Sequence, residues 1–365
     1  MAPVVTALAR HAPEVETLVA LTGQHTTLVD QVLEVFHLEP DYDLDVMQEG
    51  QSVADVVERT LHGLVPVLRE CRPDVVLVEG DTATVFTASL AAYFERVRVG
   101  HVEAGLRSDP PTKWSPFPEE MFRRLTDVVA DFHFAPTRRA SEALRAEGIP
   151  AKHIYLTGNT VVDALLSVAG RERRVTDHAL RSVLDDAGSR LVLLTAHRRE
   201  TFGAPLRQVF GAVRALADRM PDVRIVYPVH PNPNVMAPAT EMLSGHPRIH
   251  LTKPLDYLDL VTALERASLV LTDSGGIQEE APTFGTPVLV LREVTERPEA
   301  VEAGVAEVVG TDARKIVERA VAAMGRPVRG PVANPFGDGR AGERIADILA
   351  ADLTGRPRET EDWRP

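Results

Sequence analysis

The chain has 365 residues, 44% of them hydrophobic and 25% charged, with a formal net charge of −13. This length predicts two domains, and the residue balance excludes a disordered chain or a small disulfide-stapled scaffold. The acidic charge, without a lysine- or arginine-rich run, argues against a duplex nucleic-acid binder. No stretch approaches the roughly 18 apolar residues of a membrane-spanning helix. The single cysteine, Cys71, excludes internal disulfides and fits a cytoplasmic location.

The opening residues, MAPVVTALAR, predict an amphipathic helix with Val4, Val5 and Leu8 on one face. Beyond it, short runs of Val, Ile and Leu alternate with helical segments, which is typical of parallel sheets covered by helices on both faces. The predicted strands are 15–21, 74–79, 97–102, 129–134, 154–156, 190–195, 223–227, 249–252, 269–272 and 288–291. The predicted helices include 53–69, 85–94, 137–146, 206–219, 258–267, 313–324 and 339–350.

The alternation of strands and helices restarts after Leu166. We therefore predict an α/β protein of two doubly wound, Rossmann-like domains that face a cleft at the carboxyl ends of their strands. The N-terminal domain covers 1–165, with a C-terminal helix, 345–365, crossing back to it, and the C-terminal domain covers 166–344. The polar tail, 354–365, is expected to be mobile.

The second domain carries two motifs that suit a diphosphate. Strand 269–272 runs into Ser274-Gly275-Gly276 and a helix, where glycines let backbone N–H groups approach an anion. An ordinary capped helix would explain Ser-Gly-Gly alone, but the glutamates that follow favour a nucleotide, with Glu280 on the ribose. After strand 190–195 come His197 and two arginines, which match a diphosphate or a leaving group.

The first domain places carboxylates after predicted strands or at a helix start. Asp81 follows one strand, Glu103 follows the next within HVEAGLRS, and Glu119 begins a helix within PFPEE. Helix capping explains each aspartate or glutamate taken singly. We read His101 as a hydrogen-bonded core histidine. No motif has metal-ligand spacing, and the G-x-G-x-x-G match at 337–342 follows no strand, which argues against NAD binding.

Taken together and in this order, these motifs with TAHRRETFG, DSGGIQEEAP and TERPEA resemble the non-hydrolysing UDP-N-acetylglucosamine 2-epimerase family over nearly the whole chain. The resemblance implies a glycosyltransferase-B-like fold and a homodimer, used in polysaccharide biosynthesis. It also implies interconversion of UDP-N-acetylglucosamine (UDP-GlcNAc) and UDP-N-acetylmannosamine (UDP-ManNAc) without a cofactor or metal. In the family route, UDP is eliminated to leave a bound 2-acetamidoglucal and is then added back.

The resemblance also implies roles for single residues. The implied catalytic residues are Asp81, Glu103, Glu119 and His197. The implied substrate-binding residues are Arg123, Ser274, Gly275, Gly276, Glu280 and Arg297. A second UDP-GlcNAc, as allosteric activator, would contact Gln24, Gln51, Glu120, Arg198 and His230.

One departure keeps other readings open. The family resembled here opens with a strand, a turn that carries an arginine, and a first helix that starts with a lysine. This sequence begins within that helix, so we expect the first strand to be missing. The alternatives are a hydrolysing epimerase that releases ManNAc and UDP, a glycosyltransferase of the same fold, and an inactive UDP-sugar-binding protein that lacks the N-terminal strand and loop.

Overall fold

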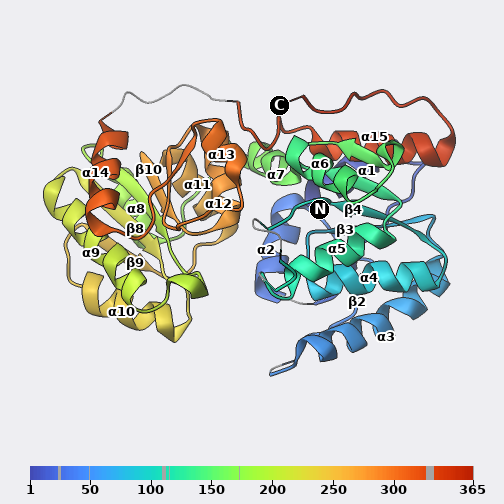
Figure 1. Cartoon of the computed structure of the whole chain (residues 1–365), viewed down its shortest axis with the longest axis horizontal. Helices are drawn as coiled ribbons and strands as arrows, with labels where there is room; N and C mark the ends of the chain where they lie inside the picture. The colour runs from blue at the N-terminus through green and yellow to red at the C-terminus, as the bar shows by residue number, and fades with distance from the viewer. Residues whose placement is uncertain are drawn as a thin grey trace. The chain divides into compact units, whose positions relative to one another are not determined.

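We describe the protein from a computed structural model, which covers residues 1–23, 26–48, 50–108, 112–114, 116–171, 173–325 and 333–364. The chain divides into two compact units, here called unit 1 (Met1–Ala164 and Phe336–Pro365) and unit 2 (Leu165–Pro335). Each unit has a parallel sheet with helices packed on it (Figure 1).

Unit 1 is built on a four-stranded parallel sheet in the order β3-β4-β5-β6. Its strands are β3 (Val75–Glu79), β4 (Arg98–Val102), β5 (Phe132–Ala135) and β6 (Ile154–Leu156). A separate parallel pair is formed by β1 (Ala20–Leu21) and β2 (Tyr42–Asp43). Its helices are α1 (Ala2–Leu8), α2 (Thr26–Phe36), α3 (Val53–Cys71), α4 (Ala83–Phe94), α5 (Glu119–Val129), α6 (Arg138–Ala146) and α15 (Ala341–Thr354).

Apolar cores hold the helices of unit 1 to its sheet. One joins α1 and α15 to the sheet through buried residues such as Val4, Ile345 and Phe134. Another joins α3 and α4 to β3 and β4 through residues such as Leu64 and Val78. A third joins α6 to β5 and β6. The predicted N-terminal helix is therefore present, and its apolar face is part of the core because α15 packs beside it.

Unit 2 contains a six-stranded parallel sheet in the order β12-β11-β10-β7-β8-β9. Its strands are β7 (Arg190–Thr195), β8 (Val223–Pro228), β9 (Ile249–Thr252), β10 (Leu269–Thr272), β11 (Val288–Val290) and β12 (Ala306–Val308). Its helices are α8 (His178–Asp185), α9 (Ala204–Arg219), α10 (Pro233–Leu243), α11 (Tyr257–Arg266), α12 (Gly275–Glu280), α13 (Pro298–Glu302) and α14 (Ala313–Met324), and α7 (Thr160–Val168) crosses from unit 1. Short 3₁₀ turns occupy Ala9–His11, Ala151–His153, Arg199–Thr201 and Ala281–Phe284.

The order of this sheet reverses between β7 and β10. From β7 the chain adds β8 and β9 on one side, and from β10 it adds β11 and β12 on the other. At such a switch point the loops that follow the two central strands diverge and leave a crevice at their carboxyl ends. The loops after β7 and β10 carry the predicted diphosphate motifs.

Two expected strands differ from the structure. The expected strand 15–21 is reduced to Ala20–Leu21. The expected strand 129–134 begins only at Phe132, because Val128 and Val129 complete α5 instead. Short apolar runs fit a helix end as well as a strand, and here Val129 is the last residue of α5 and not the first of β5.

The C-terminal tail is ordered against unit 1, so the expectation of a mobile tail is wrong. Helix α15 ends at Thr354, and the rest of the tail is not helical. Asp347 accepts hydrogen bonds from the backbone N–H groups of Glu359 and Thr360, at 2.8 and 2.7 Å. The Trp363 side chain is buried, and the backbone N–H of Trp363 donates to the Leu156 carbonyl at 2.7 Å. These contacts offset the entropy that ordering a polar tail costs.

The glycines of the G-x-G-x-x-G match serve close packing. A Cβ at Gly342 would lie 2.8 Å from the Pro3 carbonyl oxygen, and one at Gly337 would lie 3.3 Å from the Asn159 nitrogen. The start of α15 is held by Asp163, which accepts from the N–H groups of Ala341 and Gly342. These positions need small residues because backbone segments meet there.

Candidate active site

The switch point of unit 2 is organised by Asp273, at the end of β10. Its Oδ2 accepts from the backbone N–H groups of His197 and Arg198, both at 2.8 Å. Asp273 is 1% exposed, so this carboxylate fixes the loop after β7 from within the unit. The neighbouring pair Thr195 and Thr272, whose hydroxyls are 2.6 Å apart, joins the two strand ends directly below it.

Two guanidinium groups converge on the first residue of α12. A Cβ at Gly275 would lie 3.7 Å from Nη2 of Arg198 and 3.7 Å from the Arg297 guanidinium. The buried Nε of Arg198 has no hydrogen-bond partner among the described residues. The structure describes the whole first turn of α12, and no N–H group in this turn donates to the Ser274 hydroxyl. Two positive groups beside a glycine at a helix start are suited to bind an anion such as a diphosphate.

His197 and His230 lie at the same edge of the sheet. Their rings stack with centroids 5.5 Å apart. Burial lowers the pKa of His197, and the nearby Arg198 and His230 lower it further, against the opposing effect of Asp273. At neutral pH the His197 ring is therefore neutral and offers one donor and one acceptor.

Glu279 and Glu280 lie at the end of α12 with different partners. Glu279 accepts from Nε of Arg297 and so helps to orient that guanidinium. Glu280 folds back over the helix, since a Cβ at Gly276 would lie 3.4 Å from its Oε1. Burial, and then the nearby Glu279, raise the pKa of Glu280 to about 7. Glu280 is thus a half-buried carboxyl group at the end of α12.

We expect Glu280→Gln to stabilise the protein at pH 8 but much less at pH 5. The Glu280 carboxyl has a pKa of about 7 in the folded protein and about 4.3 in an unfolded chain. The folded state therefore binds its proton more tightly, and the stability from this group is lost as the pH rises through 7. Glutamine mimics the neutral acid, so thermal unfolding should show a gain of roughly 1–2 kcal/mol at pH 8, or about 2–5 °C in Tm.

The control for this prediction is Glu318→Gln, the same change at an exposed position on α14. It should shift Tm by a similar small amount at both pH values. An equal Tm gain for Glu280→Gln at pH 5 and pH 8 would contradict the assigned cause.

In unit 1, the carboxylate of Asp81 lies at the end of β3 and is paired with Arg123 of α5. Nη2 of Arg123 is 2.5 Å from Oδ2 of Asp81 and its Nη1 is 3.4 Å from Oε2 of Glu120. Glu119 lies one helical turn before Arg123 and so on the same side of α5. The structure therefore brings Asp81, Arg123 and the start of α5 together.

Glu103 lies beside Asp81, after the neighbouring strand β4. A Cβ at Gly80 would lie 3.6 Å from Oε2 of Glu103, and Nδ2 of Asn159 donates to its Oε1 at 3.2 Å. The backbone of Glu103 is left-handed, with φ of 67°. This conformation is uncommon for a non-glycine residue and is retained where surrounding contacts enforce it, often at functional positions.

Glu120 differs from its neighbour Glu119 in being fully buried. Its Oε1 accepts from Nε of Arg124 at 2.8 Å and its Oε2 from the N–H of Ser108 at 3.1 Å. Both carboxylate oxygens of Glu120 therefore have protein partners in this structure, which connects it to the scaffold around Asp81.

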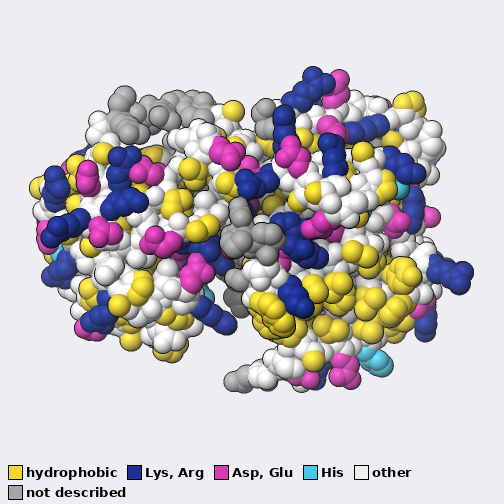
Figure 2. Space-filling model, viewed as in Figure 1, with side chains coloured by type: hydrophobic (Ala, Val, Ile, Leu, Met, Phe, Trp, Pro, Cys, Tyr) yellow, Lys and Arg dark blue, Asp and Glu magenta, His cyan; other side chains and the backbone are white. Residues whose placement is uncertain are grey.

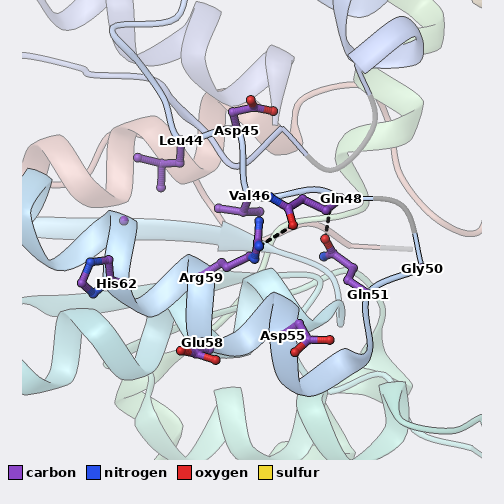
Figure 3. Close-up of a pocket in the computed structure, with 11 residues that line it drawn as sticks. Leu44, Asp45, Val46, Gln48, Gly50, Gln51, Asp55, Glu58, Arg59 and His62 are labelled. Atoms are coloured by element: carbon purple, nitrogen blue, oxygen red, sulfur yellow. Dashed lines mark hydrogen bonds between the residues drawn. The ribbon is translucent and has the colours of Figure 1, made fainter.

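A separate pocket of about 650 Å³ lies between residues 44–51 and α3 (Figure 3). Gln51 lines it and accepts from the N–H of Gln48, whose side chain in turn accepts from Arg59. Gln51 is thus placed in this pocket, whereas Glu120 belongs to the ion pairs around Asp81. Gln24 lies outside the described residues.

Several residues of these sites carried no role in the sequence interpretation. They are Asp273, which orders the His197 loop, Asn159, which contacts Glu103, and Asp127, which is buried beneath the Glu103 loop. For Asp273 a signal existed, since it directly follows a strand at the switch point. Asp127 lies inside a helix at an ordinary polar position, where sequence cannot distinguish a solvated from a buried carboxylate.

Across the described residues there is no group of three or more His, Cys, Asp or Glu side chains placed to hold a metal ion. None of the helices in the described part of the chain has the length and apolar character that a membrane crossing requires.

The fold and these sites define a class of protein. Two Rossmann-like α/β units with parallel sheets are the architecture of glycosyltransferase-B-like proteins. Residues 7–350 match the family model for UDP-N-acetylglucosamine 2-epimerase. The chain belongs to this family, which confirms the family and fold predicted from the motifs.

Named relatives and solved structures are similar to this chain over nearly its whole length. The UDP-N-acetylglucosamine 2-epimerase of Escherichia coli (strain K12) is 46% identical over 364 residues, which cover 96% of this chain and 94% of the relative. The S. aureus MnaA–UDP co-structure has a TM-score of 0.89 at 41% identity, covering 100% of this chain and 96% of that one. UDP-GlcNAc 2-epimerase from Neisseria meningitidis bound to UDP-GlcNAc has a TM-score of 0.85 at 39% identity, with 96% and 95% covered.

Proposed function

We propose that this protein interconverts UDP-GlcNAc and UDP-ManNAc by inverting C2 of the sugar, without releasing the free sugar. The observation that carries the proposal is the carboxylate cluster of unit 1, where Glu103 lies beside Asp81 and Glu119 lies one turn from the Arg123 that binds Asp81. A protein that only bound a nucleotide sugar would have no need of acid and base groups there. Family membership, and relatives bound to UDP-GlcNAc and to UDP, support the substrate.

The chemistry explains this set of residues. C2 carries an unactivated hydrogen because C1 is an acetal carbon, so direct proton removal is too difficult. Cleavage of the C1–O bond with loss of the C2 proton leaves a C1–C2 double bond and UDP as an anion. Protonation of C2 on the opposite face and return of the UDP oxygen to C1 complete the inversion. The protons leave and return, so no redox cofactor is required.

We assign removal and return of the C2 proton to Glu103 and Glu119. Positive charge develops on the sugar ring as UDP leaves, and we assign its stabilisation to Asp81. Arg123 holds Asp81 in place by its ion pair and borders the sugar.

We assign stabilisation of the negative charge on the leaving UDP to residues of unit 2. Arg297, His197 and the backbone of Ser274-Gly275-Gly276 bind the diphosphate, and Glu280 binds the ribose hydroxyls. Neutral His197 can donate a hydrogen bond to the diphosphate without a strong ion pair that would hinder its return to C1.

Proton NMR of the reaction in D₂O tests this function. We expect UDP-ManNAc to form from UDP-GlcNAc, with deuterium at C2 of both nucleotide sugars. Accumulation of free ManNAc with UDP would show a hydrolysing epimerase instead. UDP binding in calorimetry without any turnover would show a binding protein, and turnover only with a sugar acceptor would show a glycosyltransferase.

We also propose that the protein forms a homodimer through an apolar surface on α4 and α5. Figure 2 shows hydrophobic side chains gathered over this part of unit 1. Its exposed members are Tyr93, Phe94, Met121, Leu125 and Val128. An apolar patch on this scale is characteristic of a protein–protein interface, and a second copy of the chain presents the same patch for a symmetric contact.

Val128→Asp should convert the dimer into a monomer. The side chain of Val128 is 77% exposed, so the change spares the core but places a charge in the proposed interface. Light scattering after size exclusion should give twice the chain mass of 39.8 kDa for the unaltered protein and one chain mass for the variant. Val294→Asp, a valine 58% exposed in unit 2, is the control and should stay dimeric. A dimeric Val128→Asp protein would contradict this interface.

A second UDP-GlcNAc as activator is proposed for Gln24, Gln51, Glu120, Arg198 and His230. Steady-state rates against UDP-GlcNAc concentration test it, since activation by substrate gives a sigmoidal curve. A hyperbolic curve across the whole concentration range would contradict it.

A further inference from the structure

A buried histidine lies directly beneath the candidate catalytic carboxylates. His101 of β4 is 0% exposed. Its Nε2 is 2.8 Å from the carbonyl oxygen of Gly80, the residue before Asp81, and its Nδ1 is 2.6 Å from Oδ1 of Asp127. His101 therefore contacts the Asp81 loop on one side and a carboxylate of α5 on the other.

The partners of His101 determine where its protons are. A carbonyl oxygen only accepts hydrogen bonds, so Nε2 carries a proton. The other oxygen of Asp127 accepts from the N–H of Gly105 at 3.2 Å and from the Arg107 guanidinium at 2.8 Å. Burial raises the pKa of Asp127, but His101 and Arg107 outweigh it and bring that pKa below its ordinary value. Both ring nitrogens of His101 therefore face hydrogen-bond acceptors, the Gly80 carbonyl at Nε2 and the Asp127 carboxyl group at Nδ1.

Asp127 connects His101 to the second carboxylate loop. It is 2% exposed, and its bond to the Gly105 N–H anchors the chain two residues after Glu103. The next anchor is the N–H of Ala104, which donates to the Phe134 carbonyl at 3.2 Å. These two bonds hold the turn in which Glu103 has its left-handed backbone.

Further ion pairs lead from Arg107 back to Asp81. The chain of ion pairs runs from Arg107 through Glu147, Arg124, Glu120 and Arg123 to Asp81. Positive and negative side chains alternate along it, and the nitrogen–oxygen distance in each pair is between 2.5 and 3.7 Å. The Gly80 carbonyl, bound by His101, closes the ring.

We propose that His101 is a positioning residue for the reaction: by bridging the Gly80 carbonyl and Asp127, it holds the Gly80–Asp81 loop directly and the Glu103 loop through Asp127, so that the two carboxylates keep a fixed separation. The proposal rests on the proposed function, in which these carboxylates act on the sugar. Because small displacements of catalytic groups cost large factors in rate, loss of this clamp should lower kcat more than it changes KM.

His133 provides a matched control. It is the register partner of His101 on the adjacent strand, β5, and is 2% exposed. Its ring nitrogens face backbone carbonyls, those of Asp127 at 2.8 Å and His153 at 3.2 Å. Neither carbonyl belongs to the loop of Asp81 or the loop of Glu103. His133→Gln therefore removes a buried histidine from the same sheet but leaves the side-chain contacts of His101 in place.

The kinetic test compares His101→Gln, His133→Gln and Asp127→Asn as full-length proteins, with rates normalised to the folded fraction at the assay temperature. We expect His101→Gln to lower kcat for UDP-GlcNAc by about 10- to 100-fold with KM within about threefold. His133→Gln should lose stability but keep kcat within about threefold. The double variant His101→Gln/Asp127→Asn should be little slower than the slower single variant, because both break one network. Equal loss of kcat for His101→Gln and His133→Gln would overturn the proposal.

A second measurement does not depend on any variant being active. Long-range ¹⁵N–¹H spectra of histidine-labelled protein, with the His101 signals identified by their loss in His101→Gln, should show a proton on Nε2 of His101, which faces the Gly80 carbonyl. A ring protonated only on Nδ1 would overturn the proposal, because it could not donate to that carbonyl. If the unaltered protein failed to convert UDP-GlcNAc, the proposed function would fall, whereas the spectrum would still decide whether His101 donates to the Asp81 loop.

Discussion

Glu103→Gln should lower kcat for UDP-GlcNAc epimerisation by about 10²- to 10⁴-fold, the usual loss when a general acid or base is removed. Glutamine keeps the size of the side chain and can still accept from Nδ2 of Asn159, which now donates to Glu103 at 3.2 Å. Substrate binding should therefore change little, and the loss should be in kcat with KM almost unaltered. NMR of deuterium entry at C2 should show the same loss, because exchange at C2 needs the same group.

The matched control for Glu103→Gln is Glu142→Gln, on the exposed side of α6. It makes the same chemical change in the same unit and should leave kcat unaltered. If Glu103→Gln retained kcat within about threefold, Glu103 would not be the acid or base at C2, and Glu119 would be the remaining candidate.

Gly105→Ala should cause the largest loss of stability of any single methyl group added near the site. A Cβ at Gly105 would lie 2.3 Å from the Ala140 carbonyl oxygen and 2.8 Å from Cγ of Leu144. The backbone there has φ of +84°, which costs an alanine about 1–2 kcal/mol on its own. Displacing the backbone of α6 adds about 1–3 kcal/mol, so Tm should fall by roughly 10 °C in thermal unfolding.

Gly148→Ala separates the cost of the positive φ from the cost of the contact with α6. Its φ is +91°, but a Cβ there would meet nothing within 4 Å. The variant should lose only the conformational cost, about 1–2 kcal/mol. A similar fall in Tm for both variants would show that the contact with α6 does not limit position 105.

Local patterns predicted much of the fold and of the candidate site because they depend on neighbouring residues. Parallel strands covered on both faces leave apolar runs, and a polar residue directly after such a run lies at the functional edge of the sheet. That rule alone selects Asp81, Glu103 and His197 from the sequence. It failed for the tail, where burial of Trp363 depends on a surface formed by residues far away in the sequence.

The pairing of these groups was beyond the reach of the same rule. His101 read as a buried core histidine, and it is one, but its partners are Gly80 and Asp127, 21 and 26 residues away. Glu120 read as a helix-start glutamate and is instead fully buried between Arg124 and Ser108. Sequence spacing does not show which charged groups a fold will desolvate, and desolvation decides how strongly they interact.

Taken by itself, the sequence of 365 residues determined the class of this protein, which is two α/β domains and the family, and it selected the loops of the candidate site. It could do so because strand–loop–helix patterns are local and the motifs are contiguous. The tertiary structure alone decided which charges meet: Arg198 and Arg297 at Gly275, Arg123 on Asp81, and His101 beneath both carboxylate loops. The physical reason is that ionic and hydrogen-bond energies depend on distance and burial in space, which the separation of residues along the chain does not specify.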